Sequence, residues 1–127
     1  MNTKHLNTDL DIESSQDLTP IIEHFGEDVI VLYHGEAKEM IRASFELSGI
    51  IDGPDEIISH FCMLAESLTG QARKLWDNAF RKVFDIGYRA GDFPSSFNSE
   101  IRSETIERIA AIGASIAVTI YPNDGEE

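Results

Sequence analysis

Residues 40–61 read MIRASFELSGIIDGPDEIISHF, and within this stretch the spacing of the apolar residues changes from that of a strand to that of a helix. Apolar and polar side chains alternate over residues 40–48, which is typical of a half-buried strand. Residues 52–56, DGPDE, are typical of a helix start, because proline suits an early helical position and the helix dipole favours acidic groups there. From Ile57 onward apolar residues recur at helical spacing as far as Gly70, where we expect the helix to end. The stretch therefore predicts a strand followed directly by a helix.

The same patterns predict the elements on both sides of this stretch. On its N-terminal side, Thr19-Pro20 starts a short helix that Gly26 ends, and the apolar run VIVLY at 29–33 predicts a strand buried on both faces. On its C-terminal side we expect a helix over 72–80, a strand over 83–89, a helix from Ser103 to Gly113 and a strand over 116–121. This order predicts an α+β fold, with a small mixed or antiparallel sheet of about four strands and helices packed on one face.

Length and composition indicate one domain with a substantial core. The chain has 127 residues, of which 42% are hydrophobic. We expect a single α+β domain over residues 17–127, preceded by a mobile acidic leader over residues 1–16, because the leader is polar and has few apolar side chains to anchor it. The N-terminal residues lack the apolar core of a secretory signal, and no apolar run approaches the ~20 residues that a membrane span needs. We therefore expect a cytoplasmic protein.

The charge of the chain restricts its partners. Ten basic and 23 acidic residues give a net charge of −13, and residues 1–36 contain one basic and eight acidic residues. Nucleic-acid backbones and anionic lipid headgroups repel such a surface, so direct binding to either is not expected. A basic surface on another protein is the natural electrostatic complement.

No motif in the chain predicts a chemical reaction, a metal site or a cofactor. The four histidines, His5, His24, His34 and His60, share no metal-ligand spacing, and the lone cysteine, Cys62, lies among apolar residues as a structural cysteine would. The D-x-D-x-E series that starts at Asp9 fails as a calcium loop, since Ser14 and Pro20 occupy the positions that need glycine and glutamate. We expect a protein that is not an enzyme. The alternative is a small enzyme whose site is assembled from scattered histidines and carboxylates, which would need a deep polar pocket holding two of those histidines.

Partner-binding residues are expected in two regions, the acidic N-terminal third and the loop over residues 91–100. Loop aromatics are candidate anchors, because aromatic side chains dominate the energetics of protein interfaces. The candidate contact residues are Asp9, Asp11, Glu13, Glu23, Glu27, Asp28, Asp92, Phe93 and Phe97. Arg73, Asp77 and Arg81 predict a row of alternating charge on one helix, with a docking face for an acidic partner as the alternative. Trp76 is expected in the core.

Two stretches carry a family resemblance. Residues 40–61, quoted above, and residues 84–122, FDIGYRAGDFPSSFNSEIRSETIERIAAIGASIAVTIYP, resemble a family of small bacterial domains of unknown function. Some members are immunity proteins of contact-dependent growth inhibition and other polymorphic-toxin systems. The resemblance covers about half of the chain and implies no catalytic residues. It implies a protein that binds and neutralises a cognate toxin domain, and the acidic charge favours a nuclease as that toxin. The alternative is a non-catalytic adaptor or regulatory binding subunit.

Overall fold

The computed structural model describes residues 2–92 and 96–123, and within these ranges the chain forms five strands and four α-helices. The strands are β1 (Lys4–Ser14), β2 (Val29–Ala37), β3 (Met40–Leu47), β4 (Arg81–Arg89) and β5 (Ser115–Tyr121). The helices are α1 (Thr19–Phe25), α2 (Pro54–Glu66), α3 (Gly70–Asn78) and α4 (Ser103–Ala111), with a 3-10 turn η1 (Gly26–Asp28) between α1 and β2. The predicted α+β fold is confirmed.

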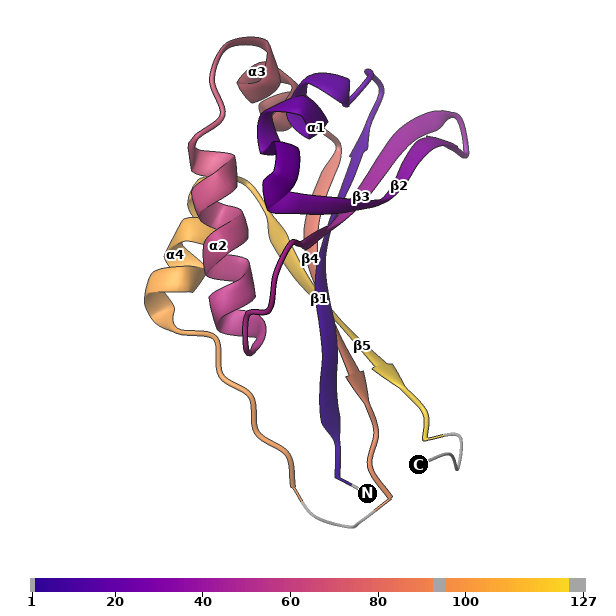
Figure 1. Ribbon diagram of the computed structural model, residues 1–127, viewed down its shortest axis with the longest axis vertical. Helices are drawn as coiled ribbons and strands as arrows, with labels where there is room; N and C mark the ends of the chain where they lie inside the picture. Colours follow the sequence, from indigo (N-terminus) through magenta and orange to yellow (C-terminus); the bar gives the residue numbers. More distant parts are fainter. Residues whose placement is uncertain (1, 93–95, 124–127) are drawn as a thin grey trace.

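All five strands form one mixed sheet in the order β2-β3-β1-β4-β5 (Figure 1). β1 is central and runs antiparallel to both β3 and β4, and β2 runs antiparallel to β3. β5 pairs with β4 in parallel, which requires a crossover connection, and this connection contains α4. The sheet therefore has five strands rather than the expected four or so.

The additional strand is β1, and it corrects the expectation of a mobile leader over residues 1–16. Thr8, Leu10 and Ile12 are fully buried, whereas the acidic residues between them are half-buried. This period of two is the pattern of a strand with one apolar face. This alternation is hard to see in the sequence because the segment is polar on average. The most acidic part of the sequence thus contains the central strand of the sheet.

The helices cover one face of the sheet and form the core with it. In Figure 1, α2 and α4 lie side by side against this face, and α1 and α3 lie near one end of it. Phe25 of α1 packs edge-on against Phe45 of β3, and Phe61 of α2 packs against Phe84 of β4. Trp76 is fully buried, as expected, and its indole Nε1 donates a 2.8 Å hydrogen bond to a backbone carbonyl in the last turn before β5.

The edge strand β2 differs from the expectation of a strand buried on both faces. The run VIVLY lies in β2, where Ile30, Val31, Leu32 and Tyr33 are each 41–47% exposed. An apolar run alone does not distinguish a central strand from an edge, and the pairing of β2 with β3 shifts register between Val31 and Tyr33. At the other edge, the predicted strand over 116–121 is formed as β5, and its apolar residues Ile116, Val118 and Ile120 are also exposed.

The start of α2 agrees with the prediction, but its end does not. α2 begins at Pro54 as predicted, but it ends at Glu66, and Gly70 begins α3 instead of ending α2. Gly70 has a φ of +56°, so it turns the chain between the two helices. Among the described residues, no helix has the length and apolar character needed to cross a membrane.

Candidate functional site

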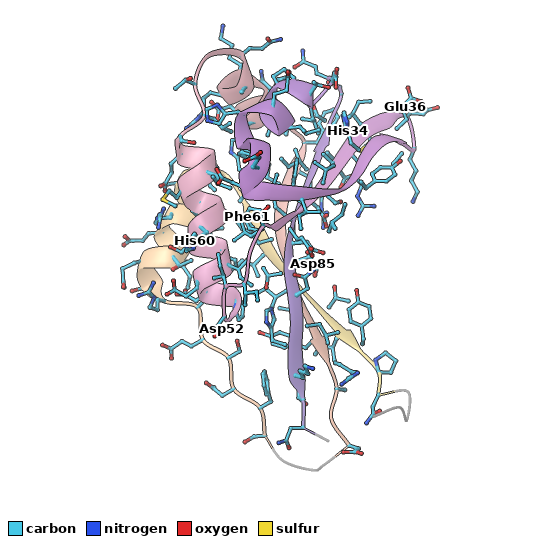
Figure 2. All side chains as sticks on the ribbon, viewed as in Figure 1. His34, Glu36, Asp52, His60, Phe61 and Asp85 are labelled. Atoms are coloured by element: carbon cyan, nitrogen blue, oxygen red, sulfur yellow. The ribbon has the colours of Figure 1, made fainter. Side chains whose placement is uncertain are left out.

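The sheet face opposite the helices, here called the outer face, carries polar and charged side chains from three strands. Strand register assigns side chains to this face, because directly opposite residues of paired strands point to the same side. Asp9 lies opposite Asp85, Asp11 opposite Ser44, and Glu13 opposite both Arg42 and Arg81. Alternation along β3 and β4 adds Glu46 and Arg89 to the outer face. Figure 2 shows Phe61 on the side of α2 that faces the sheet, whereas Asp85 lies among the strands.

Four carboxylates gather near the middle of the outer face. We call Asp9, Asp11, Glu46 and Asp85 the acidic cluster. Burial is the main cause of a rise in the pKa of Asp9 to about 6, and the negative charges of the other three members contribute to the same rise. Like charges directly opposite each other on neighbouring strands are destabilising, and Asp9 and Asp85 have this arrangement. The acidic cluster therefore lowers the stability of the isolated chain.

Basic side chains pair with the margin of this cluster but not with its centre. Arg42 Nη2 lies 3.8 Å from Asp11 Oδ1, and Arg81 Nη1 lies 3.4 Å from Glu13 Oε2. Asp85 Oδ1 accepts a 2.8 Å hydrogen bond from a neutral donor, the hydroxyl of Thr119. In the part of the chain that the structure describes, no basic side chain forms an ion pair with Asp9 or Asp85.

Unsatisfied polar atoms concentrate on the same face. Within residues 2–92 and 96–123, three buried side-chain atoms lack a hydrogen-bond partner, namely Asp9 Oδ1, Ser44 Oγ and Arg89 Nε. All three residues belong to the outer face, each on a different strand. Folded proteins leave few buried polar groups unpaired, because each costs about 1–3 kcal/mol. Among the described residues, the buried side-chain atoms that lack a hydrogen-bond partner therefore all belong to the outer face.

A hollow of about 370 Å³ opens beside the acidic cluster. Asp11, Glu13 and Asp85 line it together with Arg42 and Arg81, and the β2–β3 turn forms part of its wall. Both signs of charge thus line a recess at the margin of the outer face. A recess lined by both charges can accommodate a long polar side chain, which a flat apolar surface could not.

A second hollow, of about 360 Å³, tests the alternative of an enzyme built from scattered histidines. His5 lines it together with Glu46 and Asp52, but none of the other three histidines does. His5 Nε2 lies 2.8 Å from the hydroxyl of buried Thr8, which gives this histidine a structural partner. No group of three or more potential metal ligands is found among the described residues. The two-histidine pocket that this alternative required is not formed here.

Cys62 lies in the core, where it has the surroundings of a structural residue. Its side chain is fully buried, and burial raises the pKa of its thiol to about 11. A thiol with a raised pKa is a poor nucleophile, because the thiolate is the reactive form.

The structure brings together three of the predicted contact residues and separates the others. Asp9, Asp11 and Glu13 lie on the outer face, at every second position along β1. Glu23 of α1 and the two acidic residues of η1, Glu27 and Asp28, are exposed on the helix side. Acidic residues that are close in the sequence thus lie on opposite sides of the sheet.

The loop candidates lie away from the acidic cluster. Phe97 is 47% exposed and contacts Tyr88 edge-on, with 5.4 Å between the ring centroids, so it partly packs back onto the sheet. Asp92 is exposed just after β4. Phe93 lies outside the described residues.

Sequence reasoning missed Ser44, Glu46 and Asp85, although the sequence carries a signal for each. Ser44 and Glu46 occupy the polar side of the alternating stretch over 40–48. Asp85 is the single acidic residue within the apolar strand over 83–89. A buried strand that retains one acidic residue indicates a site where that charge is needed.

The predicted row of alternating charge is only partly formed. Arg73 pairs with Asp77 on α3, where the closest nitrogen–oxygen distance is 3.2 Å. Arg81 was expected on the same helix, but α3 ends at Asn78 and Arg81 begins β4. An exposed pair of this kind is explained by helix-surface electrostatics.

Comparisons with protein-family models, with curated proteins and with solved structures found no match to this chain. Function is therefore inferred from the outer face and from the charge of the chain.

Proposed function

We propose that this protein is an immunity protein that binds a cognate bacterial toxin domain and neutralises it. The observation that carries the proposal is the outer face, where Asp9 and Asp85 lie directly opposite each other and no basic side chain among the described residues forms an ion pair with either. An arrangement that weakens the isolated fold is retained when a partner compensates for it. The net charge of −13 indicates that this partner is basic.

A nuclease is the toxin class that best fits this surface. A nuclease must be positively charged where it holds phosphate groups. The outer face would cover that positive groove and exclude nucleic acid, so inhibition would need no chemistry from the immunity protein. Charge attraction would also raise the association rate, with an effect that decreases as salt concentration rises. We place this activity in the cytoplasm, where such a toxin would meet its substrate.

The second candidate is a non-catalytic adaptor or regulatory subunit that binds a basic protein unrelated to toxins. The same charge and the same outer face favour it. The two candidates differ in one property that a simple experiment measures, which is protection of cells from a toxin.

The test is a growth-rescue assay. The toxin candidate is the C-terminal domain of the protein encoded directly upstream of this chain's gene, expressed with and without this chain. We expect restored growth and a one-to-one complex that co-purifies. Continued growth arrest together with the absence of a complex would reject immunity against that toxin and favour the adaptor.

A further inference from the structure

We propose that the outer face receives an arginine side chain of the partner protein, with its guanidinium group between Asp9 and Asp85. This inference rests on the proposed function and adds the chemistry of the contact. The ligand that we propose is an arginine side chain of a protein, rather than a metal ion or another small ion.

The positions of the two carboxylates fit a guanidinium group. Asp9 and Asp85 are directly opposite on neighbouring antiparallel strands, so their Cα atoms are about 4.5–5.5 Å apart. A guanidinium group has five N–H donors in one plane and can bridge two carboxylates at such a spacing. The unpaired acceptor Asp9 Oδ1 would gain a donor, and the repulsion between the two aspartates would become attraction to a shared cation.

A second observation, independent of the acidic residues, also indicates a ligand at this face. Ser44 is 6% exposed, and its Oγ has no hydrogen-bond partner. Its position opposite Asp11 directs it to the outer face beside the acidic cluster. A buried hydroxyl can donate and accept, so it can bind either the side chain or the backbone of a partner segment.

The third unpaired atom distinguishes a protein partner from a simple cation. Arg89 Nε is a donor and therefore needs an acceptor. A metal ion would satisfy the carboxylates but would offer nothing to Arg89, and the described residues form no group able to hold a metal. A polypeptide supplies donors from its arginine side chain and acceptors from its backbone carbonyl groups.

Arginine fits this site better than lysine. The guanidinium group is more weakly hydrated than an ammonium group, so less free energy is lost when it enters a partly buried site. It also offers a planar set of donors to carboxylates on two strands, whereas lysine supplies a single point charge.

The test uses the whole protein and a defined probe. Hexaarginine and hexalysine peptides are titrated into isotope-labelled protein, and the ¹³C shifts of the side-chain carboxyl groups are followed by NMR. We expect hexaarginine to shift Asp9 and Asp85 at lower concentration than it shifts the exposed carboxylates of Glu104 and Glu107. Hexalysine should bind more weakly at these two residues.

Variants make the result specific. Asp9→Asn and Asp85→Asn should each weaken hexaarginine binding by at least about tenfold, the loss expected when one charge-assisted hydrogen bond is removed. Glu107→Gln on α4 removes the same charge from an exposed helix position and should leave binding within about twofold. Thermal melts of all three variants would confirm that they are folded.

Equal shifts at all exposed carboxylates, or unchanged binding by Asp9→Asn, would overturn the arginine site. Such a result would leave immunity intact if the upstream toxin is still neutralised. Conversely, specific binding of hexaarginine together with the absence of toxin neutralisation would reject immunity against that toxin while retaining an arginine-binding face. The two proposals can therefore fail separately.

Discussion

Charged residues are arranged differently on the two sides of the sheet, with opposite charges paired on one side and like charges opposed on the other. On the helix side, Arg108 of α4 binds both carboxylate oxygens of Glu66 of α2 at 2.8 and 2.9 Å, so opposite charges hold the helices together. On the outer face, Asp9 lies opposite Asp85, and burial together with the neighbouring carboxylates raises the pKa of Asp9 to about 6. Among the described residues, the buried side-chain polar atoms that lack a hydrogen-bond partner thus belong to the outer face, where we propose that a partner binds. The difference separates residues that serve the fold from residues that we assign to binding.

The largest change in the free energy of unfolding is expected from a substitution in the core on the helix side of the sheet. Phe84→Ala removes a fully buried ring that packs against Phe61, and the cavity should lower the free energy of unfolding by about 3–5 kcal/mol. Urea unfolding monitored by circular dichroism measures this loss. Asp85→Asn, at the adjacent position of β4, is the control and should not destabilise the fold. A loss below 1 kcal/mol for Phe84→Ala would contradict the assignment of the two faces.

Trp76→Phe should have the next largest effect. The change keeps an aromatic ring but leaves the carbonyl of Ile112 without its 2.8 Å hydrogen bond. We expect the free energy of unfolding to fall by about 2–3 kcal/mol, because a buried acceptor loses its donor and volume is also lost. Differential scanning calorimetry measures the change, and Tyr121→Phe at the exposed edge is the matched aromatic control. An unchanged melting temperature would show that this bond is dispensable.

Asp9→Asn should act in the opposite direction and stabilise the chain at pH 7. The pKa of Asp9 is about 6 in the folded state and 3.8 in its unperturbed state, so folding disfavours the charged form. Two pKa units correspond to ~3 kcal/mol, and the partial exposure of the site reduces the expected gain to about 1–2 kcal/mol.

The pH dependence of this gain follows from the sign of the shift. Because the folded state binds the proton more tightly, the contribution of Asp9 to stability rises as pH falls from about 6 toward 3.8. The advantage of Asp9→Asn should therefore be largest at pH 7 and much smaller near pH 4. Urea midpoints of the two proteins at both pH values measure it, and an equal difference at both would exclude the raised pKa as the cause.

Glu66→Gln should have the smallest effect, and it should destabilise. Its hydrogen bond to Arg108 lowers the pKa of Glu66, so the pair contributes stability above pH 4.5 that is lost as pH falls below this value. The pair is exposed, and we expect a loss of up to about 1 kcal/mol at pH 7. The same carboxylate-to-amide change should thus have opposite signs at Glu66 and Asp9. Stabilisation by Glu66→Gln in urea unfolding would remove the contrast between the two sides.

Periodicity predicted most of the fold. The alternation over residues 40–48 and the DGPDE helix start correspond to β3 and α2, and the strand expected over 83–89 corresponds to β4. β1 was not predicted because the segment is polar on average, and its short apolar alternation at Leu10 and Ile12 is surrounded by polar and acidic residues. The exposure of β2 was missed because an apolar run carries no information about which strands lie beside it.

The candidate site could be predicted only in part. Asp9, Asp11 and Glu13 follow from the density of acidic residues near the N-terminus. The pairing of Asp9 with Asp85 joins positions 76 residues apart through strand register, and periodicity within a segment does not determine register between segments. The burial of the Ser44 hydroxyl without a hydrogen-bond partner depends on which strands lie beside it. Strand pairing therefore brings Asp85 and Ser44 to the same face as Asp9, and the sequence alone does not predict this pairing.

One measurement tests the central claim most directly, namely toxin protection by the double variant Asp9→Asn/Asp85→Asn. The variant is compared with the wild-type protein and with the helix-side control Glu104→Gln/Glu107→Gln on α4, which removes the same charge. We expect the double variant to be at least as stable as the wild-type protein and yet to fail to protect cells, whereas the control protects them fully. Full protection by the double variant would contradict the assignment of the outer face as the binding surface.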